Sequence, residues 1–322
     1  MDMERTHDRL GRRYRSRPVS TGKRIRPSER DILLFEKLHR HGPLSTRYLV
    51  AYSQLLRKSA TRAKDRLTDL FNEDDTPHNG TYLDRPWQQF ETLDARQNDL
   101  VYDLTPQSIR VLKEQGLWSD DAPHPGGSWK HAYMTAAITA SIELATLQTE
   151  NVRYIFQDEI LSRSDAPFSF PVCVQGITKN LIPDALFGLE YTQDGKPAYR
   201  FFLVEADRAT EPGRAQSFDR KSYARTILQY REFVGKGQYK QALDLTAGLL
   251  VLNVTTSERR HRNLLDLTTE LSQSNGNNYL LFQYAPDFGR YFRPPSILHG
   301  LFTDGWERAG RDPFFINSIS SA

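Results

Sequence analysis

Residues 181–207, LIPDALFGLEYTQDGKPAYRFFLVEAD, contain the strongest indication of the fold of the larger part of the chain. Two near-continuous apolar segments, 181–191 and 198–207, flank the turn TQDGK, whose Asp194-Gly195 dipeptide is a strong hairpin signal. The pattern predicts two strands joined at this turn. Strands that are apolar on both faces are typical of a sheet that helices cover on both sides.

Three carboxylates interrupt these apolar segments. Asp184 follows Pro183 in the first strand, and Glu205 and Asp207 end the second. If the strands pair through the turn, Asp184 and Glu205 lie near each other, and alternation puts Glu205 and Asp207 on one face. A bound divalent cation would compensate their charge, and hard oxygen ligands suit Mg²⁺ or Mn²⁺. We therefore expect a metal site at Asp184 and Glu205, with Asp207 as a possible third carboxylate.

A basic helix is predicted to follow these strands over residues 216–235. Lys221, Arg225 and Gln229 recur at every fourth position and share one face of this helix. A cation beside an acidic strand end can stabilise a phosphate and help to orient an attacking water. The predicted catalytic residues are Asp184, Glu205, Asp207 and Lys221.

Plainer interpretations of the same residues remain open. Asp207 can cap the turn that follows it and pair with Arg208 or Arg214, while Lys221 is only solvated. His131 belongs to no metal-binding spacing, and a core or capping role is the more common one for such a histidine.

The remaining elements complete an α-β-β-β-α-β-α-β order. This order predicts a mixed sheet with helices on both faces, and so an α/β (α+β) domain over residues 131–285. We expect residues 286–322 to form a wrapping tail of low regularity. The further segments are a helix at 131–147, strands at 152–156, 247–254 and 279–284, and a helix at 257–271.

The N-terminal part has a different pattern. Helices are predicted to begin after Ser28, Ser45 and Ser59. A fourth begins at Thr105-Pro106 after two extended segments, 81–90 and 100–104. Three helices, a hairpin and a closing helix are typical of a winged helix-turn-helix, which we expect over residues 28–116. A linker rich in Asp, Pro and Gly then covers 117–130.

Basic residues favour DNA as the partner of this part. Residues 1–26 contain nine Lys or Arg against three acids, a net charge of +6 in a chain whose total is +3. We expect residues 1–27 to be a flexible arm that binds phosphates. A solvated helix face and a solubilising tail are the alternatives. The predicted DNA-binding residues are Arg57, Lys58, Thr61, Arg62, Lys64, Arg24 and Arg26.

Composition excludes several classes of protein. The 322 residues are 38% hydrophobic and 26% charged, which is typical of a globular chain of about two domains. No apolar run has the length of a membrane helix, and the N-terminus lacks the apolar core of a signal peptide. Cys173 is the single cysteine, so an internal disulfide and a thiolate zinc site are excluded. We expect a cytoplasmic protein without a membrane partner.

Together these residues resemble a known family. The second part resembles the PD-(D/E)XK nuclease-like core, and the fuller pattern over residues 28–285 is similar to the bacterial replication-relaxation family. The residues that carry the resemblance are Ile182-Pro183-Asp184-Ala185-Leu186, the run 202–211 (FLVEADRATE), Lys221, Tyr230, the segment opening at His131 and Tyr102-Asp103-Leu104-Thr105.

The resemblance implies a DNA-binding accessory protein of plasmid replication, relaxation or mobilisation. It implies a winged helix followed by a restriction-endonuclease-like domain. The expected partner is double-stranded DNA, and plasmid replication or mobilisation proteins and a second copy of the chain are possible partners. The nuclease pattern has Glu-x-Lys, whereas Asp207 stands at the lysine position here, and Lys221 is the substitute. An active Mg²⁺-dependent endonuclease and a transcription regulator with a dimerising second domain remain alternatives.

Overall fold

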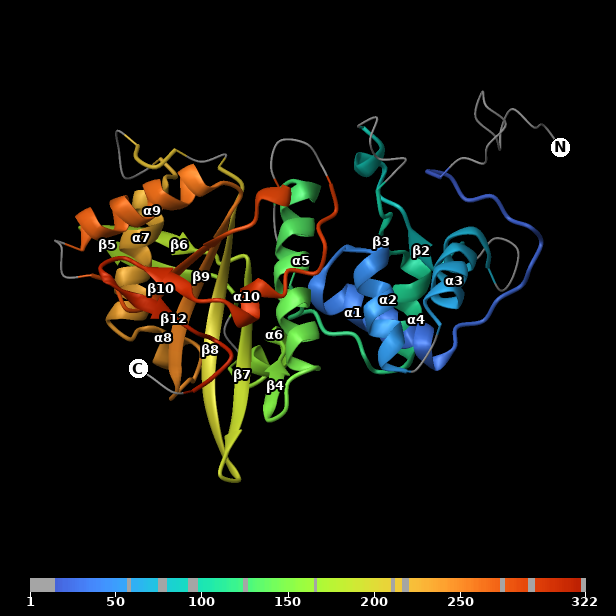
Figure 1. Cartoon of the computed structure of the whole chain (residues 1–322), viewed down its shortest axis with the longest axis horizontal. Coiled ribbons are helices and arrows are strands. Elements are labelled where there is room, and N and C mark those ends of the chain that lie inside the picture. The colour runs from blue at the N-terminus through green and yellow to red at the C-terminus, as the bar shows by residue number, and fades with distance from the viewer. Residues whose placement is uncertain are drawn as a thin grey trace. The chain divides into compact units, whose positions relative to one another are not determined.

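The chain folds into two compact units, which are described separately (Figure 1). Unit 1 comprises Met1–Ser119 with Tyr291–Ile297, and unit 2 comprises Asp120–Arg290 with Leu298–Ala322. The computed structural model describes residues 15–56, 59–74, 80–91, 98–123, 127–164, 167–209, 212–215, 220–272, 276–288 and 293–319. None of the helices in these ranges combines the length and the apolar composition that crossing a membrane requires.

Unit 1 is built from four helices and a small sheet. The helices are α1 (Glu29–His41), α2 (Thr46–Leu55), α3 (Ala60–Asn72) and α4 (Pro106–Glu114), each beginning after the capping residue that the sequence predicts. Strands β1 (Leu44–Ser45), β3 (Val101–Leu104) and β2 (Leu83–Asp84) form an antiparallel sheet in that order. Residues 87–90, expected to be extended, form a 3₁₀ turn instead.

A buried ion pair ties α3 to the start of α1. Asp31 accepts hydrogen bonds from the backbone N–H and the hydroxyl of Ser28, both at 2.7 Å. The guanidinium of Arg66 on α3 donates to the same carboxylate, with Nη2 2.7 Å from Oδ2. Because the side chain of Asp31 is fully buried, Arg66 supplies the charge that compensates it. Arg66 therefore has a structural partner and differs in this from its exposed neighbours on α3.

The segment before α1 is more ordered than the sequence predicts. The hydroxyl of Ser20 and the backbone N–H of Thr21 both donate to Glu73 at the end of α3. Ile25 is buried, and its N–H donates to the carbonyl of Asp74 at 3.0 Å. The expectation of a flexible arm is thus wrong for residues 20–25, because Glu73 and one apolar side chain fix them to the domain. Residues 1–14 lie outside the described part of the chain.

Unit 2 is a seven-stranded mixed sheet with helices on both faces, as the sequence predicts (Figure 1). In spatial order the strands are β12 (Arg311–Phe314), β11 (Trp306–Arg308), β10 (Leu280–Tyr284), β9 (Gly248–Thr255), β8 (Lys196–Asp207), β7 (Ala185–Gln193) and β4 (Val152–Ile155). β4, β7 and β8 are antiparallel neighbours, and β8, β9 and β10 run parallel.

The β7–β8 hairpin has the predicted turn. Gln193 pairs with Lys196, which leaves Asp194 and Gly195 as a two-residue loop. Both loop residues have positive φ angles of 51° and 73°, as a type I′ turn requires. This turn fixes the register down the hairpin to the pair Ala185 and Val204 at its other end.

The helices of unit 2 divide between the two faces of the sheet. α5 (Trp129–Thr146) packs against β4, β7 and β8, and its side chains from Tyr133 onward are almost all buried. α7 (Tyr223–Tyr230), which a π-helical turn continues to Gly235, and α9 (Glu258–Leu271) cover the opposite face. Their apolar side chains join Leu186 of β7 and alternate residues of β8, β9 and β10 in one core.

Two parts of unit 2 were not foreseen. Between β4 and β7 the chain forms α6 (Gln157–Leu161) and a separate hairpin of β5 (Phe170–Val174) and β6 (Ile177–Leu181). After β10, the low regularity expected for residues 286–322 is wrong, because α10 (Gly300–Thr303), β11 and β12 extend the sheet. Trp306 and Ile316 are fully buried there, so this segment belongs to the core.

A buried carboxylate on β3 is expected to make the stability of unit 1 depend on pH. Asp103 on β3 lies opposite Asp84 on β2, and burial, followed by the charge of Asp84, raises the pKa of Asp103 to about 6. Because the folded state holds this proton more tightly than the unfolded state, the stabilisation present below about pH 4 is lost as the pH rises through 6. We expect Asp103→Asn, which stays neutral, to raise the free energy of unfolding by about 1 kcal/mol at pH 7 and hardly at pH 4. Urea unfolding at both pH values measures this, and an equal effect at the two would contradict it.

Candidate functional site

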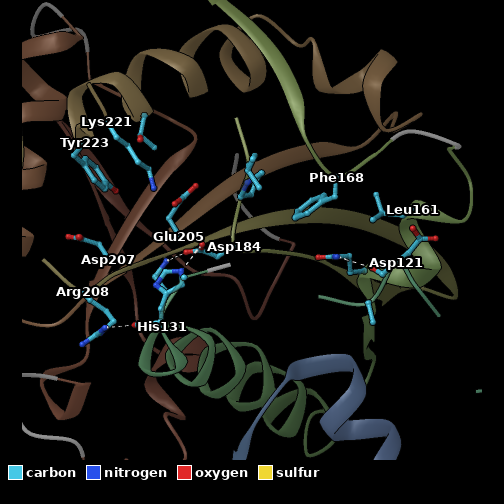
Figure 2. A pocket seen from close by; sticks show the side chains of 18 of the residues that line it. Asp121, His131, Leu161, Phe168, Asp184, Glu205, Asp207, Arg208, Lys221 and Tyr223 are labelled. Atoms are coloured by element: carbon cyan, nitrogen blue, oxygen red, sulfur yellow. Dashed lines mark hydrogen bonds and ion pairs between the residues drawn. The ribbon is translucent and has the colours of Figure 1, made fainter. Parts of the chain in front are cut away.

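A cavity of about 850 Å³ opens at the ends of β7 and β8 in unit 2 (Figure 2). It is lined by residues from the start of α5, the start of β7, the end of β8 and the approach to α7. All four of the predicted catalytic residues line it. They are Asp184, Glu205, Asp207 and Lys221.

Asp184 is held by two elements at once. The hairpin register pairs Ala185 with Val204, and the N–H of Asp184 donates to the carbonyl of Val204 at 3.0 Å. Its Oδ2 accepts the N–H of Ala206 at 2.7 Å, and its Oδ1 lies 2.8 Å from Nε2 of His131. The carboxylate is therefore oriented from β8 on one side and from α5 on the other, with 17% of the side chain still exposed.

Glu205 follows Val204 and thus lies opposite Asp184 at the end of the hairpin. The hydroxyl of Tyr230 on α7 donates to its Oε1. Burial, and then the charge of Glu205, raises the pKa of Tyr230 well above its ordinary value, so this hydroxyl stays protonated. Figure 2 shows Glu205 and Asp184 next to each other, with Asp184 beside His131 and the carboxylate of Glu205 directed toward the side where Lys221 lies.

Asp207 has a different environment from the other two acids. Nε of Arg260 on α9 lies 2.6 Å from its Oδ2, and Nη2 lies 3.3 Å from its Oδ1. Thr255 on β9 donates to it as well, and only 7% of the side chain of Asp207 is exposed. Both oxygens are thus occupied by a cation from the core, which favours a structural role over that of a third metal ligand.

Two cationic side chains reach the cavity. Lys221 precedes α7 and extends toward Glu205 in Figure 2. Arg208 follows Asp207, and its Nη1 donates to the hydroxyl of Ser128 at 2.9 Å. Burial lowers the pKa of Arg208 from its ordinary value, although a guanidinium keeps its charge at any physiological pH.

Two carboxylates of this pocket could act as ligands of a divalent cation. Within the described ranges, no group of three or more His, Cys, Asp or Glu side chains converges to hold a metal ion. Asp184 and Glu205 remain as two carboxylates in one pocket. Mg²⁺ is commonly bound by one or two carboxylates together with waters and the phosphates of a substrate, so this pair is compatible with it.

The residues predicted to bind DNA lie in unit 1. Thr61, Arg62 and Lys64 are exposed on α3, whose opposite face is buried through Ala63, Leu67, Leu70 and Phe71. Arg24 and Arg26 are exposed in the segment before α1. Arg57 and Lys58 lie outside the described residues.

Two partners in this site were missed from the sequence. His131, expected in the core or at a cap, lines the pocket and contacts Asp184. Arg260, rather than Arg208 or Arg214, pairs with Asp207. Neither had a local signal, since each contact joins segments more than 50 residues apart. An acid in an apolar strand does, however, signal that some partner must exist.

Comparison with known proteins gives the family. A model of the replication-relaxation family matches residues 35–248, which is more than half of the chain and includes every residue that lines the pocket. The chain therefore belongs to the replication-relaxation family. This membership suggests a role in plasmid replication or relaxation. No curated protein and no solved structure matches the chain.

The role of Asp207 can be tested through stability. Asp207→Ala leaves Arg260 nearly buried without its carboxylate, and we expect a loss of about 3 kcal/mol in the free energy of unfolding. Replacing the pair by Asp207→Leu with Arg260→Met should recover much of this loss, because no buried charge is then left alone. Urea unfolding measures both. An Asp207→Ala variant of unchanged stability would contradict the structural role.

Proposed function

We propose that the protein is a DNA-binding accessory of plasmid replication, relaxation or mobilisation, whose second unit is a nuclease-like domain. The observation that carries this proposal is the pair Asp184 and Glu205 at adjoining strand ends, in a pocket that Lys221 also lines. Two carboxylates beside a lysine, at the open end of a mixed sheet, suit the chemistry of a phosphodiester. Family membership supports the same biological setting.

The order of elements in unit 1 supports a winged helix-turn-helix. Three helices precede β2 and β3, and α4 closes the domain. α3 would be the helix that enters the major groove, because it buries one face and exposes Thr61, Arg62 and Lys64 on the other. Arg24 and Arg26, exposed in a segment fixed to the end of α3, would add phosphate contacts.

This assignment predicts a change in the salt dependence of duplex binding. We expect Arg62→Ala with Lys64→Ala to weaken binding and to reduce the slope of log affinity against log salt by about 2, because two phosphate contacts are lost. Fluorescence anisotropy on a labelled duplex measures it. Lys113→Ala on α4, also exposed, is the matched control.

Point substitutions are preferable to removing residues 1–26, since Ile25 is part of the core of unit 1.

In unit 2, Asp184 and Glu205 would hold a Mg²⁺ or Mn²⁺ ion. Bound there, the ion would polarise a phosphate and lower the pKa of a water. The residues of the chain provide the rest. His131 and the N–H of Ala206 orient Asp184, Tyr230 orients Glu205, and Lys221 would attract the phosphate. Strand cleavage is the second candidate function. The position of Lys221 in the pocket favours it. Asp207 would take no part as a metal ligand, because it is paired with Arg260.

Metal binding and cleavage can be separated by substitution. We expect Asp184→Asn and Glu205→Gln each to weaken Mn²⁺ binding at least about tenfold, measured by calorimetry, because each removes a ligand charge. Asp194→Asn at the far turn is the matched control, since asparagine also tolerates a positive φ. On supercoiled plasmid with Mg²⁺, Lys221→Met should abolish nicking while Mn²⁺ still binds. Unchanged Mn²⁺ binding in both acid variants would refute the metal assignment.

A further inference from the structure

The pocket of unit 2 has two ends of different chemistry. One end contains Asp184, Glu205 and Arg208, with His131 and Lys221 beside them. Figure 2 shows Phe168 and Leu161 away from this cluster, with Asp121 beside Leu161. Apolar side chains of Ala122, Ile182 and Pro183 also line the pocket.

Part of the apolar lining of the pocket is open to water. Ile182 is 63% exposed, although it directly precedes the Pro183-Asp184 pair that enters β7. Phe168 is only partly buried, and its ring meets that of Phe170 edge-on at 5.8 Å. Exposed apolar surface beside a polar site has a hydration cost, which a flat aromatic ligand would relieve on binding.

The end of the pocket that contains Asp184 and Glu205 also contains Arg208, whose side chain is held in place and could bind an anion. Arg208 is half-buried, held by the hydroxyl of Ser128, and forms no ion pair with a carboxylate in the described part of the chain. Burial lowers its pKa from the ordinary value, but the guanidinium keeps its charge. A guanidinium in this position is suited to bind a phosphate through paired hydrogen bonds.

We propose that this pocket binds a short segment of single-stranded DNA, with one base against Phe168, Ile182 as further apolar contact surface, and a phosphate of the segment at Arg208. Inside a duplex both faces of a base are stacked, so the base must come from a single strand or from an unpaired end. This inference rests on the proposed function, because it names the substrate of the same site.

The experiment uses the full chain carrying Arg62→Ala and Lys64→Ala, so that α3 contributes little to binding. A fluorescent oligodeoxythymidylate of about ten nucleotides is titrated in the presence of a chelator, and anisotropy is measured over a range of salt concentrations. We expect Phe168→Ala to weaken binding about tenfold with an unchanged salt slope. Arg208→Gln should weaken binding and reduce the slope by about 0.7, the value for one phosphate on a single strand.

Three further variants guard against effects of misfolding. Ile182→Ser alters a side chain that is already exposed, and it should weaken binding without loss of stability. Tyr199→Ala and Lys240→Gln remove an exposed aromatic residue and an exposed cation that do not line the pocket, and they should bind normally. An iododeoxyuridine oligonucleotide should cross-link to the peptide that contains Phe168.

The outcomes separate this inference from the proposed function. Binding that is unaffected by Phe168→Ala, Ile182→Ser and Arg208→Gln, or equally weakened by the two controls, would overturn the inference. If the same protein still binds Mn²⁺ through Asp184 and Glu205, the proposed metal site survives that failure. Oligonucleotide binding that depends on Phe168 and Arg208 supports the inference even where Mn²⁺ does not bind, since the assay contains a chelator.

Discussion

The geometry of the candidate site depends on the register of the β7–β8 hairpin. The two-residue turn at Asp194-Gly195 sets this register, and it ends with Asp184 opposite Glu205. A slip of one residue would send one of the two carboxylates to the other face of the sheet. The turn lies at the far end of both strands, so the position of the acids is determined by a contact that is remote from them.

Each acid of this strand end has a partner from a different helix. His131 on α5 contacts Asp184, Tyr230 on α7 donates to Glu205, and a guanidinium on α9 pairs with Asp207. These contacts stabilise the carboxylates, whose burial beside an apolar sheet would otherwise cost free energy. They also give the acids different roles, because the first two remain open to the pocket while Asp207 is almost enclosed.

The pairing of Asp207 has a consequence for the charge of the pocket. Arg260 from α9 neutralises Asp207. The positive charge available to a ligand is then supplied by Lys221 and Arg208, which approach the pocket from two different segments. A phosphate would therefore meet cations on two sides of the carboxylate pair, an arrangement compatible with a nucleic-acid strand.

The sequence was sufficient to predict the features that depend on a few neighbouring residues, namely the helix caps of unit 1 and the turn at 194–195. The mixed sheet and the proximity of Asp184 to Glu205 join residues further apart, but the apolar strand patterns and the two-residue turn between them indicated which strands pair. The tertiary structure was needed to find that His131 contacts Asp184, that Arg260 pairs with Asp207, and that residues 306–314 add two strands. Caps, turns and alternation act through local backbone geometry. Partners that lie far apart in the chain are selected by packing, which no short pattern encodes.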